Sequence, residues 1–568
     1  MNIYVNQLGY LPAGNKIAVF AFPQAEDAAP PSPSEPALLC REDGTSVLEK
    51  CPVPFGWDEA SGDYIFHMDF SEVTQKGTYH ICWNGTSSHP FSVGTELYSD
   101  LNVLLARALY YQRCGTALLK EHAGKFARPA CHTAPTVLWT EYEKYLAGEL
   151  AESDMNRLDI RGGWHDAGDY GRYTTAGACA LAHVLYAYRF FPNAFTKSLN
   201  IPESGNGTPD ILNECRYELD WLLRMQTEDG SVSHKQSTLH HAAFVMPHED
   251  TNQMLLLPAS SMATGSFAAI MALASRIYRP FDTDFSDKAF AAAKKSYEWL
   301  TAHPEFLFDP TPNVHTGGYG DRSDFDERMW AAMEFYRCTG ESRYLEEAHT
   351  YFKEQPYPIQ YGWADVSGFA AWALLEPELV PDADLKEDSY LSVTEQEFRI
   401  AYKEIILKET DHLLDVVAAS GYGVALGTKE YPWGSNLMVL NRGMLFSTSH
   451  LLTAKPKYCI AAAKQMDYLL GVNATDYSYV TGVGSHAFRN PHNRVTVADG
   501  IDETIPGFVS GGANRRPSDE KAKWMLLPDT PPMKCYLDIW ECYSLNEITI
   551  YWNSPAIFCA AFLDTLPK

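Results

Sequence analysis

The period of the hydrophobic positions changes near residue 98. Before it, short runs of β-branched and aromatic residues alternate with turns, as is typical of strands. The clearest runs lie at 3–5, 16–20, 63–68 and 78–83, and a Pro-rich stretch at 29–33 predicts a loop. These features predict a small antiparallel sandwich of roughly immunoglobulin size over residues 1–93.

From about residue 98 onward, apolar positions recur with the period of an α-helix. Twelve segments show this pattern: 100–119, 173–191, 206–227, 263–280, 286–303, 324–339, 341–353, 363–376, 395–418, 433–452, 456–470 and 547–564. They fit six helical hairpins closed into a toroid, although a bundle or a solenoid would give the same count. No repeat of fixed length is visible, which weakens the solenoid. The Gly/Pro-rich stretch 471–546 predicts a long functional loop.

Composition narrows the classes of partner. The 568-residue chain is 46% hydrophobic and carries a net charge of −27, which disfavours nucleic acid and anionic membranes. No apolar run approaches the roughly 18 residues of a membrane span. The first six residues lack the basic start and apolar run of a signal peptide. Twelve scattered cysteines are typical of buried free thiols, so we expect a cytoplasmic protein.

Two short segments carry the candidate chemistry. In 162–170, Asp166 and Asp169 lie in a glycine-rich loop flanked by aromatic residues, and Glu547 directly precedes an apolar helix. Small residues leave the acids accessible, and aromatic rings offer flat surfaces beside them. This composition favours a sugar-cleaving site, in which one carboxylate activates water and a distant carboxylic acid protonates the leaving oxygen. From the residues alone, a capped loop or a calcium site remains an alternative.

Further segments resemble those of one known family and occur in the same order along nearly the whole chain. Jointly they are specific for that family, although each alone is weak. They are 5–10, 163–170, 244–247 with 258 and 263–264, 326–327 with 330–332, 433–436, 478–482 with 491–494, and 546–547 with 552–553. Together they resemble glycoside hydrolase family 9, the inverting cellulases. The resemblance implies a mainly α fold, an (α/α)6 barrel over residues 98–568, preceded by an immunoglobulin-like domain over residues 1–93.

The resemblance also assigns roles to the three acids. It implies that Asp169 is the general base, that Asp166 helps to hold the attacking water, and that Glu547 is the general acid. The base needs polar surroundings and the acid apolar ones, such as those Ile548 and Ile550 could supply. An inverting enzyme separates acid and base by about 6.5–9.5 Å to admit the water.

Candidate sugar-binding residues come from the same comparison. His492 and Arg494 resemble the family's sugar-binding pair, although Asn493 stands where the family usually has a second histidine. The alternative for His492 is a packed loop histidine. Further candidates for contact with pyranose rings are Trp433, Tyr431, Trp164 and Tyr543, although an unassigned tryptophan is more often a core residue.

Two sets of residues could bind metal ions. Cys114, Cys131, His132 and His165 have ligand types that suit zinc, but their spacing is not that of a standard finger. Cys114 could equally be a helix thiol. The resemblance implies a closed, structural zinc that anchors the catalytic loop.

The second set lies in the oxygen-rich stretch 321–327, which suits calcium. The resemblance implies ligands among Ser323, Asp326, Glu327 and the later Asp365. The alternative is that these acids only charge the start of the following helix, an interpretation that Arg328 slightly favours.

We therefore expect an inverting hydrolase of β-1,4-glucosidic bonds in cello-oligosaccharides or soluble β-glucans, without an organic cofactor. An exo-β-glucosaminidase or β-glucosidase on the same scaffold is the alternative, with Glu430 or Glu249 as a carboxylate for an ammonium group. A non-catalytic carbohydrate-binding protein is disfavoured by the presence of all three acids. The sequence does not indicate whether the enzyme acts in an exo or an endo manner, and it does not indicate an oligomeric state.

Overall fold

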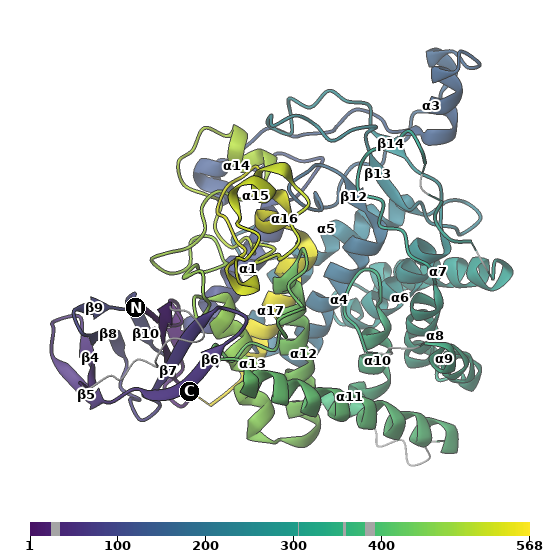
Figure 1. Ribbon diagram of the computed structural model, residues 1–568. Coiled ribbons are helices and arrows are strands. Elements are labelled where there is room, and N and C mark those ends of the chain that lie inside the picture. Colours follow the sequence, from purple (N-terminus) through teal and green to yellow (C-terminus); the bar gives the residue numbers. More distant parts are fainter. Residues whose placement is uncertain (24–34, 305, 310, 356–358, 381–391, 568) are drawn as a thin grey trace. The chain divides into compact units, whose positions relative to one another are not determined.

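The computed structural model describes residues 1–23, 35–304, 306–309, 311–355, 359–380 and 392–567 (Figure 1). The loop expected at 29–33 lies outside these residues. The chain forms two compact units. The first comprises residues 1–108, 407–496 and 501–568, and the second comprises residues 109–406 and 497–500.

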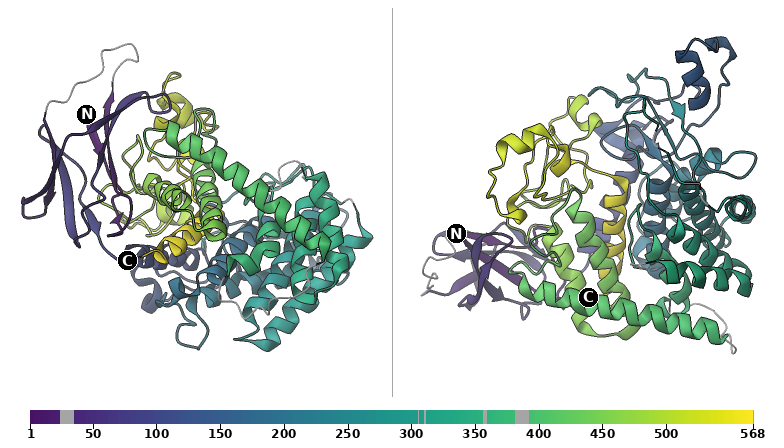
Figure 2. Two further views of the ribbon diagram at one scale, coloured as in Figure 1. Left: turned by 90° about the horizontal axis from the view of Figure 1, so that it is seen from below. Right: turned by 45° about the vertical axis from the view of Figure 1, so that its right-hand side comes forward.

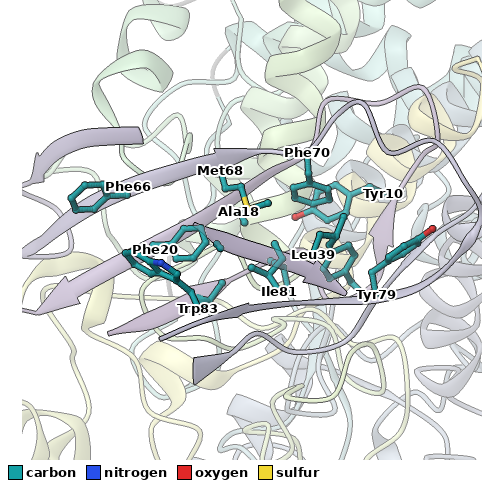
Figure 3. Packing of buried hydrophobic residues seen from close by; sticks show 14 of the residues in the cluster. Tyr10, Ala18, Phe20, Leu39, Phe66, Met68, Phe70, Tyr79, Ile81 and Trp83 are labelled. Carbon is teal, nitrogen blue, oxygen red and sulfur yellow. The ribbon is translucent and has the colours of Figure 1, made fainter. Parts of the chain in front are cut away.

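The first unit begins with a β-sandwich. One sheet has the order β1 (Asn2–Tyr4), β3 (Ile17–Pro23), β7 (Asp63–Asp69) and β6 (Val53–Asp58). The other has the order β2 (Gly9–Tyr10), β10 (Phe91–Val93), β8 (Gly77–Trp83), β4 (Ala37–Arg41) and β5 (Ser46–Lys50), with β9 (Thr86–Ser87) beside β8. Apolar side chains such as Phe20, Phe66, Leu39 and Ile81 fill the space between the sheets (Figure 3). The four predicted strands correspond to β1, β3, β7 and β8.

The same unit contains three long helices, α12 (Ser435–Thr453), α13 (Pro456–Leu469) and α17 (Ile550–Asp564), and α12 packs against the other two. It also holds most of α1 (Leu97–Tyr111) and the second half of α11 (Val393–Ala419). Helix α17 is apolar on all sides and almost wholly buried, as expected for a core helix. Its first turn is capped by Thr549, whose side chain accepts from the backbone N–H of Trp552.

The sandwich lies beside the helical part of its own unit (Figure 2), and hydrogen bonds join the two. Asn6 Nδ2 donates to Asp467 Oδ1 at 2.7 Å, and the backbone N–H of Gln7 donates to the carbonyl of Leu470 at 2.9 Å. The Gln7 side chain also accepts from the backbone N–H of His486 at 2.8 Å. The polar residues of the N-terminal segment thus join the sandwich to the end of α13.

The second unit is mainly helical. Its long helices are α4 (Thr174–Phe190), α5 (Asp210–Met225), α6 (Ser261–Tyr278), α7 (Thr283–Ala302), α8 (Phe325–Thr339), α9 (Ser342–Glu354) and α10 (Ser367–Leu379). The Ala-rich α6 is buried along nearly its whole length and contacts α4, α5, α7 and α8. Small side chains allow such close approach of neighbouring helices. The first part of α11 also belongs to this unit.

Short elements connect these helices. A small sheet in the second unit has the order β11 (Val137–Leu138), β14 (Leu255–Leu256), β13 (Lys235–Ser237) and β12 (Arg172–Tyr173). The remaining short helices are α2 (Lys120–Ala123), η1 (Gly124–Phe126), α3 (Trp139–Leu146), η2 (Glu152–Asp154), η3 (Pro192–Phe195), α14 (Arg494–Ala498), α15 (Glu520–Met525), η4 (Pro532–Lys534) and α16 (Tyr543–Asn546).

Each of the twelve predicted helical segments corresponds to a long helix. The largest difference is at α1, which ends at Tyr111 instead of continuing to residue 119. Residues 112–114 leave the helix to bond with the loop at 163–165. Within the described residues, no helix combines the length and the apolar character needed to cross a bilayer. All twelve cysteines are free thiols.

Candidate active site and metal centres

The loop at 162–171 in the second unit is anchored by the segment that follows α1. The backbone N–H of Cys114 donates to the carbonyl of Gly163 at 2.8 Å, and that of His165 donates to the carbonyl of Gln112 at 2.7 Å. The Gln112 amide donates to the carbonyls of His165 and Ala167. These bonds fix the backbone on both sides of Asp166.

Helix α5 also supports this loop, through contacts at Gly163 and Trp164. Glu218 accepts from the backbone N–H of Trp164 at 2.5 Å, and burial raises the pKa of Glu218 to about 8. Gly163 has φ +77°, and a Cβ there would lie 2.7 Å from Trp221. Glycine is therefore required by both the backbone conformation and the close approach of α5.

Asp169 has a polar, hydrogen-bonded carboxylate. Its Oδ2 accepts from the backbone N–H of Gly171 at 3.0 Å and from the hydroxyl of Tyr173 at 3.3 Å, and His241 Nδ1 lies 3.2 Å away. Donors of this kind stabilise the ionised form. Lys235 also lies near Asp169, and its positive charge favours the ionised carboxylate. Burial lowers the pKa of Lys235 to about 8, and the charge of Asp169 partly opposes this effect.

Asp166 has different surroundings. The side chain is buried, and its Oδ2 accepts from the hydroxyl of Tyr319 at 2.5 Å. Its Oδ1 is buried with no hydrogen-bond partner among the described residues. Burial, and then the charge of Asp169, raise the pKa of Asp166 well above its usual value. The pair is therefore asymmetric: both acids are buried, but Asp169 accepts more hydrogen bonds and is the stronger candidate for an ionised base.

Three of these partners, Tyr173, Tyr319 and His241, were not predicted. Tyr173 and Tyr319 are in ring contact, with centroids 4.5 Å apart, so they form one aromatic wall beside the two acids. In the sequence, only their positions could have pointed to the site. Tyr173 follows the acidic loop, His241 precedes the segment 244–247 that resembles the family, and Tyr319 lies among glycines. The fold brings Tyr319 and His241 to the acids from distant points in the chain, whereas Tyr173 is close in sequence.

Glu547 lies in the first unit, between α16 and α17, and its side chain is half-buried. Its backbone is held by the neighbouring segments: Glu547 pairs with His492 in a parallel bridge, and the N–H of Gly511 donates to the carbonyl of Glu547 at 2.9 Å. Ser510 pairs with Ile548 on the following residue. The structure thus brings predicted acid Glu547 and predicted sugar ligand His492 together.

Other predicted sugar ligands lie around His492. His492 Nδ1 donates to the carbonyl of Trp540 at 2.7 Å, which fixes the ring, and the ring of Tyr543 is 5.7 Å from it. Trp433 is 5.4 Å from Tyr543 and is 47% exposed, so it can offer a face to a sugar. Arg494 is 6% exposed at the start of α14.

Two predicted stacking residues are corrected. Trp164 and Tyr431 have no exposed surface, so neither can stack on a sugar in this conformation. The indole N–H of Trp164 donates to Glu214 at 2.9 Å, which makes it part of the support of the acidic loop. The sequence pattern could not separate a buried aromatic residue from an exposed one in these loops.

The four predicted zinc ligands form one buried cluster. One ligand atom from each of Cys114, Cys131, His132 and His165 lies within 4.8 Å of all the others. Cys114 Sγ is 3.5 Å from His132 Nδ1, and Cys131 Sγ is 3.8 Å from His165 Nε2. Ligand atoms around a tetrahedral zinc are about 3.3–3.8 Å apart, as follows from its bond lengths, so the set fits this ion.

The surroundings of the cluster match a thiolate and imidazole site. Arg128 donates to Cys131 Sγ at 3.2 Å, and hydrogen bonds from Cys114 and both imidazoles lower the pKa of Cys131 well below its usual value. Asp250 Oδ2 lies 3.3 Å from His132 Nε2. A carboxylate on the outer nitrogen of a ligating histidine is the usual means of orienting it.

Three of the predicted calcium ligands, Asp326, Glu327 and Asp365, form an acidic cluster at the starts of α8 and α10. Their ligand atoms are not all within 4.8 Å of one another, unlike those of the Cys114 set, and Ser323 lies just before α8. Burial and the charge of Asp365 raise the pKa of Asp326 to about 7, and the pKa of Asp365 rises to about 6, chiefly through burial. Both carboxylate oxygens of Glu327 are buried without a hydrogen-bond partner in the described part of the chain. Buried acids in this state require protons or a cation.

Arg328 does not supply that cation. It pairs with Asp324 at 2.9 Å and donates to the carbonyls of Leu300 and His303. Asp324 makes no side-chain cap on α8, and Ser323 accepts from the backbone N–H of Phe325. The interpretation of these acids as simple helix-start charges is therefore weakened, because Asp326 and Glu327 are buried and not solvated.

Known proteins resemble this chain over its whole length. Residues 98–560 match glycosyl hydrolase family 9, and residues 1–88 match the cellulase N-terminal Ig-like domain. A cellodextrinase from Butyrivibrio fibrisolvens is 38% identical over 98% of each chain.

Two solved structures extend the comparison. AaCel9A in complex with cellobiose-like isofagomine matches with a TM-score of 0.88 and 32% identity over 100% of both chains. A Zn-binding triple mutant of the GH family 9 endoglucanase J30 matches with a TM-score of 0.85 and 30% identity over 97% of this chain and 99% of that one. The predicted fold class, an (α/α)6 barrel preceded by an immunoglobulin-like sandwich, is confirmed. The chain belongs to glycosyl hydrolase family 9.

Proposed function

We propose that this glycoside hydrolase cleaves β-1,4-glucosidic bonds in cello-oligosaccharides or soluble β-glucans, with inversion at the anomeric carbon. The observation that carries the proposal is the asymmetry of the acidic pair, with Asp169 hydrogen-bonded and Asp166 buried with an unpaired oxygen. The substrate class is supported by the 38% identical cellodextrinase and by the cellobiose-like ligand of AaCel9A.

In the proposed reaction, Asp169 takes a proton from water while the water oxygen bonds to the anomeric carbon. Asp166 accepts a hydrogen bond from the same water and orients it. The glycosidic bond breaks as Glu547 donates its proton to the leaving oxygen. One water is consumed and an α-configured product is released from a β-linked substrate.

The neighbours of Glu547 are proposed to bind the sugar. His492 and Arg494 would hydrogen-bond hydroxyl groups, and Trp433 with Tyr543 would contact a pyranose face. The ring contact between Trp433 and Tyr543 and the exposure of Trp433 support this assignment.

We infer that Cys114, Cys131, His132 and His165 hold a structural zinc. Four soft donors in one cluster, with Asp250 behind His132, support this inference. Such an ion would do no chemistry on the substrate; it would hold the loop that carries Asp166 and Asp169.

We also infer a calcium ion bound by Ser323, Asp326, Glu327 and Asp365. The carboxylate oxygens of Glu327, which have no hydrogen-bond partner among the described residues, support it, because a hard cation would compensate their charge. Its role would be to stabilise the starts of α8 and α10.

The glucosaminidase alternative gains no support from its proposed carboxylates. Glu430 pairs with Arg442 at 2.6 Å, and Glu249 accepts from the backbone N–H of Met246. We keep the cytoplasm as the expected compartment, with the free thiols as its support.

A substrate panel tests the proposal. Cellobiose through cellohexaose, a soluble β-glucan and chitosan oligomers are each incubated with the enzyme, and products are followed by chromatography. We expect turnover of the cello-oligosaccharides and the β-glucan. Turnover of chitosan oligomers alone would contradict the assigned sugar.

A further inference from the structure

The outer face of the N-terminal sandwich carries a second set of soft metal ligands. Cys40 lies on β4, and His80 and Cys82 lie on the neighbouring antiparallel strand β8. Cys40 is directly opposite His80, and Cys82 is opposite Leu38, two residues along β4. The three side chains therefore share one face of the sheet.

That face is the one turned away from the core. Leu39 and Ile81, the residues between them, point into the sandwich (Figure 3). Side chains alternate along a strand, so Cys40, His80 and Cys82 point outward. Cys40 is nevertheless only 6% exposed, and the other two are half-buried, so the cluster is partly shielded from solvent.

The three ligand atoms are close enough to share one ion. Two sulfurs and one imidazole nitrogen lie within 4.8 Å of one another, close to the spacing around a tetrahedral zinc, about 3.3–3.8 Å. Ser87 Oγ lies 3.3 Å from Cys82 Sγ on the neighbouring β9. A hydroxyl or a water on that side would complete four ligands.

We propose that Cys40, His80 and Cys82 form a zinc site that cross-links β4 and β8. The site is separate from the Cys114 cluster and does not depend on the proposed hydrolytic function. Each thiol would release its proton as the sulfur binds Zn²⁺, and His80 would bind as the neutral imidazole. Two thiolates and an imidazole favour zinc over calcium or magnesium.

The test is a count of zinc in the full chain. Wild type and the Cys82→Ser variant are purified under reducing conditions, loaded with Zn²⁺, dialysed and measured by elemental analysis. Cys51→Ser is the matched control, because Cys51 is an exposed thiol of the same domain. We expect about one zinc fewer per chain in Cys82→Ser and no change in Cys51→Ser.

Comparison between variants keeps the two zinc sites distinguishable. The difference between wild type and Cys82→Ser reports only the β4–β8 site, whether or not the Cys114 cluster binds zinc. His80→Gln provides a second variant that retains both thiols, and cobalt loading adds a thiolate-to-cobalt absorption that should weaken in both variants. Circular dichroism identifies any variant that fails to fold.

Equal zinc content and equal cobalt spectra in wild type, Cys82→Ser and His80→Gln would overturn the proposal. A Cys40–Cys82 disulfide formed on oxidation, together with no zinc difference under reducing conditions, would do the same.

Discussion

The loop that carries Asp166 and Asp169 and the segment that carries Glu547 are held in different ways. Both segments have backbone hydrogen bonds to their neighbours, but the acidic loop is also supported by side chains from other parts of the chain: Glu218, Gln112 and the Cys114 cluster. Glu547 is held by backbone pairing with His492 and Gly511. The position of the base, Asp169, should therefore be sensitive to substitution of the metal ligands and of the other supporting side chains. The position of the acid, Glu547, should not.

The largest effect is expected for Glu547→Gln. Hydrolysis of natural oligosaccharides should fall by about 10²–10⁴-fold, because a general acid is lost. An aryl glycoside with an activated leaving group should be hurt much less, because it needs little protonation. Rates on the two substrates are compared at saturation, with Glu520→Gln, an exposed glutamate, as the unaffected control. Equal losses on both substrates would remove Glu547 from the acid role.

Asp169→Ala should lose activity to a similar degree but with the opposite signature. The water lacks its base whatever the leaving group, so both substrates should slow alike. Asp166→Ala should be similar or milder. Zinc content and thermal stability should stay close to those of the wild type. If the Asp169→Ala variant retained its rate on the aryl glycoside but lost it on natural oligosaccharides, Asp169 would act on the leaving group instead.

His165→Ala tests the sensitivity of the base side to its metal support. Zinc content should drop by about one ion per chain, and kcat should fall by roughly 10²-fold, since a displacement of about 1 Å at a catalytic group has that effect. The loss should be insensitive to the leaving group, as for Asp169→Ala. His248→Ala, which removes an exposed histidine, should change neither quantity. Full activity in zinc-free protein would show that the cluster is an ordinary packing site.

The smallest effect concerns the acidic cluster, which we expect to change stability and leave the chemistry intact. Because the pKa of Asp326 is raised to about 7 and that of Asp365 to about 6, the calcium-free folded protein binds more protons than the unfolded chain between about pH 4 and 7. The stability of the calcium-free protein should therefore fall as the pH rises from about 4 to about 7, and the loss should be complete above the raised pKa of Asp326. Calcium should restore the lost stability.

This dependence is measured as Tm against pH with EGTA and with calcium. A change of a few degrees at pH 7 is expected, because 1 kcal/mol moves Tm by about 2–4 °C in domains of 150–250 residues. Asp326→Asn should flatten the EGTA curve. A calcium response that persists in Asp326→Asn would place the ion elsewhere.

The long elements of the fold were predictable because burial imposes a period on them. Helices such as α6 and α17 are apolar over many turns, and their segments were identified within a few residues. The strands β11 to β14, of two or three residues each, are too short to show a period and were missed. The end of α1 at Tyr111 depends on hydrogen bonds to residues 163–165, which no local pattern encodes.

The site was predictable in part. The acids and soft ligands stand in short segments that resemble the family, so the Cys114 cluster could be named before its geometry was known. Tyr319 and His241 could not, because they reach the acids only through the fold. Trp164 and Tyr431 were misassigned because burial of an aromatic residue in a loop is a tertiary property.

The most direct test of the division between base and acid is the anomeric configuration of the first product. Proton NMR of early time points follows hydrolysis of a β-linked cello-oligosaccharide before mutarotation. The account predicts the α-anomer, formed by one direct attack of a water activated by Asp169. Initial appearance of the β-anomer would mean retention through a covalent intermediate and would contradict the role assigned to Asp169.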